Sequence, residues 1–259
     1  MSHSLNVMWF VPQPLAMLAA QAPGATGIRA SRTTSSDVQF AALAAGESDV
    51  VVTAMDNVIG WNRRPGPKDF RVVAQVERTT SLALFAAPGR SKMTDLRGAS
   101  LLVDAPDNGF VIALRAMLRE AGIDEQGCRF VPAGGVMERY AALLAGGGDA
   151  TLLGPPFTNQ AAEAGLTQIA SVQETWPAFP GQGIVMRKAC AARERVGAWL
   201  RELDQARRQL GDLSSLRPPA EGIAVLTAHR RLLGLSGAED TYANIVDASL
   251  LDVYLEKDQ

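Results

Sequence analysis

A segment of this sequence occurs twice, and the repeat constrains the fold more than any other feature. Residues 41–49 are AALAAGESD and precede the run VVVT, while residues 141–149 are AALLAGGGD and precede the run ATLL. In each copy a predicted helix ends at a glycine, Gly46 or Gly146, and an acidic residue leads into a buried strand. Two units of one design predict two α/β lobes of similar plan, with a ligand site in the cleft between them.

Strand-like and helical runs alternate through the first 190 residues, which favours parallel sheets covered by helices. The predicted strands are residues 5–10, 27–31, 49–53, 70–75, 82–86, 100–104, 129–132, 150–153, 166–172 and 183–186, and the predicted helices are residues 14–22, 38–45, 110–121, 137–145 and 191–211. We expect the strand at 183–186 to return to the first lobe, because only helical sequence follows it. The sequence therefore predicts a discontinuous lobe I, residues 1–86 and 182–259, and a lobe II, residues 87–181.

Charge and hydropathy exclude several classes of protein. The 259 residues include 27 acidic and 25 basic side chains without a long run of either sign, which argues against nucleic-acid binding. There is no uninterrupted apolar stretch of roughly 18 residues, so no membrane span is predicted. The first residues lack the basic start and apolar core of an export signal. The sequence as written predicts a cytoplasmic protein, or a periplasmic one if a signal peptide has been removed.

The inventory of catalytic motifs is poor. The two histidines are His3, before the first strand, and His229, in the helical tail. Neither position favours a catalytic Ser-His-Asp or Cys-His arrangement. We expect His229, next to Arg230 and Arg231, to lie on a helix surface. Zinc-protease, C-x-x-C, Walker and dinucleotide-binding motifs are absent, and the triple glycine at 146–148 follows a helix instead of preceding one. No metal ion and no cofactor is predicted.

Ligands of open α/β sheets gather at the carboxyl ends of strands, where loops enter helix N-termini. That rule selects residues 9–13, 33–36, 53–57, 104–110, 133–136 and 154–157. Asp56 and Asn57 are expected to face the cleft, because a charge and an amide directly after a buried run need partners or water. In the last loop Gly154 and Phe157 are favoured over the two prolines, which lack N–H donors.

Other residues of these loops have two interpretations each. Ser35 is an ordinary helix N-cap or a ligand contact, and the same alternatives hold for Asp107 and Asn108. Trp9 is either a core aromatic residue at a strand end or an aromatic wall of the cleft.

Three runs, residues 41–52, 95–103 and 141–156, resemble the type II periplasmic binding protein fold in the right order. The most similar branch contains nitrate, sulfonate and taurine solute-binding proteins and thiamine-pyrimidine synthase-like proteins, and the resemblance covers about residues 5–190. It implies a two-lobe clamp with two hinge-crossing segments, a helical C-terminal tail, and closure on a small polar or anionic ligand. Carried over by position, the contacts would come from Trp9, Gln13, Ser35, Thr53, Asp56, Asn57, Asn108, Gly109 and Gly154.

The resemblance implies two functions of different classes. The favoured one is a solute-binding protein that delivers a small organic ligand to an ABC-type importer. The alternative is a cytoplasmic, cofactor-free decarboxylase or dehydratase of a small carboxylic acid, in which Asp56 or Asp107 would be the general acid or base. The cysteine-rich segment and the histidine of the pyrimidine synthase branch are missing, so that chemistry is not expected. An effector domain of a transcription regulator would need a DNA-binding module, and none precedes residue 5.

The charge of the ligand is left open by the sequence. An anion would be held by N–H and hydroxyl donors at helix N-termini, unless an arginine such as Arg32 or Arg78 folds inward. A neutral or cationic ligand paired with Asp56 is the competing hypothesis.

Overall fold

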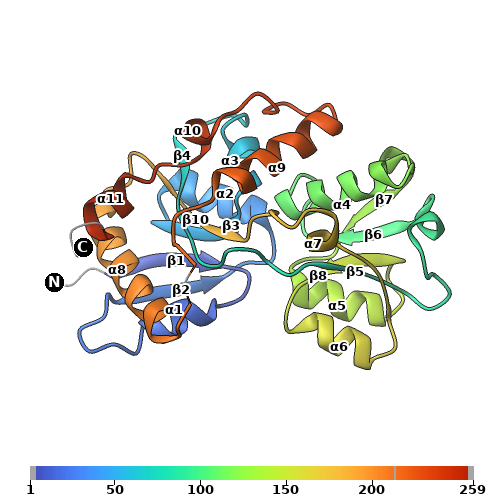
Figure 1. The fold of residues 1–259 in the computed structure, drawn as a ribbon, viewed down its shortest axis with the longest axis horizontal. Helices are drawn as coiled ribbons and strands as arrows, with labels where there is room; N and C mark the ends of the chain where they lie inside the picture. Colours follow the sequence, from blue (N-terminus) through green and yellow to red (C-terminus); the bar gives the residue numbers. More distant parts are fainter. Residues whose placement is uncertain (1–3, 213, 256–259) are drawn as a thin grey trace.

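The computed structural model describes residues 4–212 and 214–255, which form two five-stranded sheets in two lobes (Figure 1). The first sheet has the order β2 (Ile28–Arg32), β1 (Leu5–Trp9), β3 (Val50–Ala54), β10 (Gln182–Arg187), β4 (Phe70–Gln75). The second has the order β7 (Arg129–Pro132), β6 (Ser100–Val103), β8 (Ala150–Leu153), β5 (Ala83–Ala86), β9 (Thr167–Ser171). His3 lies outside the described residues.

The two sheets share one plan, as the repeated segment predicts. In each sheet two parallel pairings are followed by a strand that runs antiparallel to both of its neighbours: β10 in the first sheet and β5 in the second. Each of these strands comes from the opposite side of the cleft, so the chain crosses between the lobes at residues 76–82 and again at residues 172–181. The two crossings expected from the resemblance are confirmed.

One predicted boundary differs from the sheet topology. The sequence places residues 1–86 in the first lobe, but β5, at residues 83–86, pairs with β8 and β9 of the second sheet. The first crossing therefore precedes β5. Its four residues are buried on both faces, and such a pattern fits either sheet equally well. The strand β10, in contrast, returns to the first sheet as predicted.

Helices cover both faces of each sheet (Figure 1). The first lobe carries α1 (Pro14–Ala19), α2 (Ser36–Ala45), α3 (Asp56–Trp61), α8 (Arg193–Gln209), α9 (Ala220–Leu232), α10 (Tyr242–Ile245) and α11 (Ser249–Leu255). The second carries α4 (Gly109–Glu120), α5 (Val136–Leu144) and α6 (Phe157–Glu163), with the 3-10 turns Met93–Leu96 and Glu125–Gly127, and α7 (Val172–Thr175) opens the second crossing. No helix within residues 4–212 and 214–255 is long and apolar enough to cross a membrane.

The repeated residues have the same structural roles in both lobes. Gly46 and Gly146 both have φ near 75°, the left-handed conformation that ends α2 and α5 and that glycine adopts at little cost. The Asp49 carboxylate accepts the backbone N–H of Asn6 at 2.8 Å, and the Asp149 carboxylate accepts that of Ser100 at 2.7 Å. Each repeated aspartate thus fastens the start of the neighbouring parallel strand.

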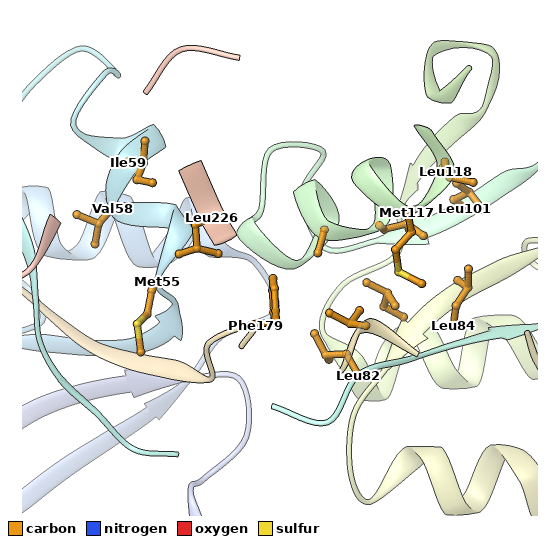
Figure 2. Close-up of a cluster of buried hydrophobic side chains, with 14 of the residues drawn as sticks. Met55, Val58, Ile59, Leu82, Leu84, Leu101, Met117, Leu118, Phe179 and Leu226 are labelled. Carbon is orange, nitrogen blue, oxygen red and sulfur yellow. The ribbon is translucent and has the colours of Figure 1, made fainter. Parts of the chain in front are cut away.

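One hydrophobic cluster continues from lobe to lobe. It joins side chains of α3 and the first sheet to side chains of β5, β6 and α4. Figure 2 shows Phe179 between the two groups, with Met55 and Leu226 on one side and Leu82 and Met117 on the other. Phe179 belongs to the second crossing and Leu226 to α9, so the hinge region and the C-terminal tail are both part of the core.

Candidate functional site

A cavity of about 570 Å³ lies between the lobes. Its walls come from the loop after β1, from the first crossing, and from the strand ends and helix N-termini of the second lobe. Most wall side chains are apolar, among them Phe10, Pro12, Leu82, Phe110 and Leu114. The volume and the apolar lining with a few polar groups are typical of a site for a small organic molecule.

Among the described residues that line the cavity, Arg139 is the only cation. It lies on α5, and its side chain is 12% exposed. Its Nε donates to Thr151 Oγ1 at 3.1 Å, Nη1 to the Gly134 carbonyl at 3.1 Å and Nη2 to the Leu152 carbonyl at 3.2 Å, while Nη1 is 3.9 Å from Asp104 Oδ1. Burial lowers the pKa of the guanidinium, although an arginine of this kind stays protonated.

Asp104 follows β6 directly and is buried in the cavity wall. Its Oδ2 accepts the side-chain amide of Asn108 at 3.0 Å and the backbone N–H of Ser36 at 3.4 Å. Ser36 is the first residue of α2 in the other lobe, so this contact crosses the cleft and places a carboxylate at a helix N-terminus. Burial raises the pKa of Asp104 despite the opposing effect of Arg139.

Glu77 is the second carboxylate in the cavity wall and belongs to the first crossing. Its Oε1 accepts the side-chain amide of Gln182 at 3.1 Å, the backbone N–H of Gln182 at 3.4 Å, and the hydroxyl of Thr80. Gln182 opens β10 at the end of the second crossing. The carboxylate therefore ties the two crossing segments together at the cavity.

Three of the residues predicted from the sequence as ligand contacts line the cavity: Gln13, Asn108 and Gly154. Gln13 donates its side-chain amide to the Val11 carbonyl at 3.1 Å. Asn108 caps α4 by accepting the Phe110 N–H at 2.8 Å, which confirms its N-cap interpretation; its ligand contact stays a prediction. Each of the three follows or begins an element at the cleft edge of its sheet, as the strand-end rule requires.

Three other residues predicted as ligand contacts lie outside the cavity wall. Trp9 is 5% exposed and packs in the core of the first lobe. Ser35 is the N-cap of α2 and accepts the Asp37 N–H at 3.1 Å. The Phe157 ring packs against Tyr140, with 5.5 Å between ring centroids.

The two aspartates proposed as catalytic groups are also outside the wall. Asp107 is exposed. Asp56 is buried and forms an ion pair with Arg230 of α9, from Nε to Oδ1 at 2.8 Å and from Nη2 to Oδ2 at 2.5 Å. Asp56 satisfies its need for a partner through the C-terminal tail and does not line the cavity.

Thr53, Asn57 and Gly109 form a contact between the lobes. The Asn57 amide donates to Thr53 Oγ1 at 2.7 Å, and its Oδ1 accepts the Gly109 N–H at 2.9 Å. A Cβ at Gly109 would lie 2.8 Å from that of Asp56 and 3.0 Å from that of Ala54. The close approach of α4 to α3 thus requires glycine at this position.

The arginines considered as anion ligands lie elsewhere. Arg32 pairs with Glu138 across the cleft at 2.6 Å with both side chains partly exposed, and Arg78 is 3.9 Å from Glu221 at the surface. His229, which was expected on the surface, is only 3% exposed, because α9 packs it against Trp176 with 4.0 Å between ring centroids. That expectation was wrong, because α9 faces the second crossing.

Sequence reasoning missed the three charged residues of the wall. Asp104 carries the same signal as Asp56, an acidic residue directly after a buried strand, and its loop was selected without singling it out. Arg139 sits inside a helix and Glu77 inside a connection. Neither position carries a local signal, since their approach to the cavity depends on how the lobes pack.

No protein-family model and no curated protein matches this sequence. Solved structures match over nearly the whole chain. The ligand-binding component of an ABC-type import system from Staphylococcus aureus, solved with zinc bound, has a TM-score of 0.77 at 10% identity and covers 97% of this chain and 99% of that chain. The fold is that of type II periplasmic solute-binding proteins.

Two further structures agree with this fold. A protein from Bordetella bronchiseptica RB50 has a TM-score of 0.76 at 15% identity, covering 98% of this chain and 97% of that chain. The alkanesulfonate-binding protein SsuA from Xanthomonas axonopodis pv. citri, bound to MOPS, has a TM-score of 0.66 at 16% identity, covering 98% of this chain and 90% of that chain. At these identities the likeness concerns the architecture, and the ligand has to be inferred from the cavity. Within residues 4–212 and 214–255, no group of three or more His, Cys, Asp or Glu side chains is placed to hold a metal ion.

Proposed function

We propose that this protein is a solute-binding protein that closes its two lobes around a small organic ligand and presents it to an ABC-type importer. The observation that carries the proposal is the cavity itself, which lies between the lobes and has in its wall the first crossing segment and Gln182, the residue directly after the second crossing. Glu77 and Gln182 connect these segments inside the site, so ligand contacts there would act directly on the hinge. The similarity to the S. aureus import component and to the X. axonopodis alkanesulfonate-binding protein supports a role in import.

The ligand can be found by capture from a mixture of small molecules. The purified protein is incubated with a small-molecule extract, washed, and denatured, and the released compounds are identified by mass spectrometry. A compound that also raises the melting temperature of the protein is a ligand that binds the native state. We expect at least one such compound to be recovered chemically unchanged.

A matched pair of variants makes this experiment specific for the cavity. Val136→Trp enlarges a wall residue and is expected to abolish the capture, whereas Met137→Trp changes the next residue of α5, which is 45% exposed and not in the wall. Equal capture by both variants would show that the ligand binds elsewhere. Neighbouring genes for a permease and an ATPase would support the importer.

One observation favours the alternative enzymatic function. Burial raises the pKa of the Asp104 carboxyl within the cavity, and a carboxylic acid of this kind can act as a general acid in a cleft that excludes water. In a decarboxylase or dehydratase reaction, Asp104 would be the general acid or base in place of Asp56 and Asp107, which lie outside the wall. Recovery of a captured compound that has lost carbon dioxide or water, and its recovery intact from Asp104→Asn, would establish this alternative in place of simple binding.

A further inference from the structure

We infer that the ligand of this cavity carries a protonated amine that pairs with the carboxylate of Asp104, attached to an apolar, ring-sized body. The inference rests on the proposed function, because it names the chemical class of the solute that the same cavity would hold. The resemblance implies a small polar or anionic ligand; the inference favours a cationic one, and four features of the wall support it.

The first feature is that the cation of the wall is already engaged. Three N–H groups of Arg139 donate to Thr151, Gly134 and Leu152 at 3.1 to 3.2 Å. A guanidinium has five N–H groups, so two remain for an anionic ligand, and such a ligand would have to bind them close to the Asp104 carboxylate. The guanidinium is thus held as part of the second lobe, where it faces Asp104 at 3.9 Å.

The second feature is that one helix N-terminus at the cleft, that of α2, already faces an anion. The backbone N–H of Ser36, in the first turn of α2, is directed at Asp104 Oδ2 at 3.4 Å. A carboxylate or sulfonate placed there would lie beside the Asp104 carboxylate, and like charges at such a distance repel. This N–H donor of α2 is therefore covered by the protein's own carboxylate.

The third feature is the net negative charge of the cavity wall. Two carboxylates, Glu77 and Asp104, and one guanidinium, Arg139, line the cavity, so its formal charge is −1. Asp104 is 9% exposed, and its separation from Arg139 is too long for a hydrogen bond. A carboxylate held in an apolar wall is stabilised by a nearby cation, so an ammonium group near Asp104 would offset part of the cost of its burial.

The fourth feature is the shape and polarity of the remaining wall. Phe10 and Pro12 of the first lobe and Phe110 and Leu114 of the second line the same cavity. Aromatic and aliphatic side chains on both sides suit a flat, apolar group, which gains free energy when its surface leaves water. An arylalkylamine combines both requirements.

The experiment compares ligands that differ only in the charged group. Benzylamine, phenethylamine and tryptamine are titrated into the protein by calorimetry, each beside the carboxylate with the same ring and linker, for example indole-3-propionate for tryptamine. We expect at least one amine to bind at least tenfold more tightly than its carboxylate partner. Asp104→Asn should weaken binding of that amine at least tenfold without weakening binding of the carboxylate, while Asp107→Asn, at an exposed position, should change neither.

Each contrary result has one meaning. Carboxylates that bind as tightly as the amines overturn the inference and leave the proposed solute-binding function standing. Failure of every amine to bind also overturns it, and the extract capture with Val136→Trp then decides the proposed function independently. The comparison of amine with carboxylate uses the unaltered protein, so it holds even if Asp104→Asn folds poorly.

Discussion

Asp56 and Asp104 both follow a buried strand, but their partners separate their roles. Asp56 forms two short hydrogen bonds with Arg230, and both side chains are almost fully buried. Asp104 meets the Arg139 guanidinium only at 3.9 Å and is part of the cavity wall. Asp56 is thus neutralised within the protein, whereas Asp104 has no cation within hydrogen-bond distance among the described residues and lies in the cavity wall.

Replacement of Asp56 should therefore lower stability. Asp56→Ala leaves the Arg230 side chain, which is 5% exposed, as an unpaired buried charge, and such changes cost about 3–5 kcal/mol. Urea unfolding monitored by circular dichroism measures the loss. The double variant Asp56→Ala, Arg230→Met is the control and should recover part of the stability. A loss below about 1 kcal/mol for Asp56→Ala would contradict a buried ion pair.

His229 should make stability depend on pH. Its ring lies between Trp176 and Phe179, neither ring nitrogen has a hydrogen-bond partner among the described residues, and burial lowers its pKa from 6.5 to about 4. Because the unfolded chain takes up a proton at a higher pH than the folded protein, the stabilising contribution is complete above pH 6.5 and is lost as the pH falls towards 4.

The expected loss from this histidine between pH 7 and pH 5 is about 2 kcal/mol. It is measured as the free energy of unfolding of the protein minus that of His229→Phe at each pH. The variant keeps an aromatic ring and removes the titrating group. An equal pH dependence in both proteins would show that His229 is not buried in its neutral form.

At the scale of elements, α3 and α4 meet across the lobes at Gly109. Its N–H donates to Asn57 and its Cα faces Asp56, with no space for a side chain. The loops that begin these two helices follow β3 and β6, one in each sheet. The close contact of two helix N-termini therefore sets how near the two strand ends approach.

Gly109→Ala should disturb this contact. The added Cβ would lie within 3.0 Å of two carbon atoms, and relief of such an overlap costs about 1–3 kcal/mol, partly offset by the higher helix propensity of alanine. Gly127→Ala is the matched control, because a Cβ there meets no atom within 4 Å. Chemical denaturation of both variants measures the difference, and equal stabilities would mean that the α3–α4 contact does not form in solution.

At the scale of the whole molecule, the tail helix α9 connects the lobes. It packs against α4, supplies Ile223 and Leu226 to the shared core, and carries Arg230 to Asp56. Two lobes joined only by two crossing segments could unfold separately. A hydrophobic core that continues through α9 and Phe179 predicts a single cooperative transition instead (Figure 2).

Leu226→Ala tests this role of the tail. Leu226 is 2% exposed, so its truncation should cost about 2–5 kcal/mol and separate the unfolding of the two lobes. Leu232→Ala, on the same helix but 40% exposed, should cost less than about 0.5 kcal/mol. Tryptophan fluorescence and circular dichroism should give coincident transitions for the unaltered protein. Coincident transitions at unchanged midpoint in Leu226→Ala would contradict a connecting role for α9.

The repeated architecture could be predicted from local features of the sequence. Helix periodicity, the glycines at 46 and 146 and the buried runs after them are local signals, because each depends on hydrogen bonds and conformations within a few residues. The strand-end rule likewise led to Gln13, Asn108 and Gly154, since strand ends are local features that the sheet brings to one edge.

Which polar residues line the cavity depends on long-range packing. Asp56 is hydrogen-bonded to Arg230, 174 residues away in the sequence, and Asn57 is hydrogen-bonded to Gly109, 52 residues away. Arg139 and Glu77 reached the cavity from a helix and a crossing segment without any local pattern. Burial makes an unpaired charge costly, so the long-range packing of the lobes and the tail selects which charges are neutralised by the protein and which remain for a ligand.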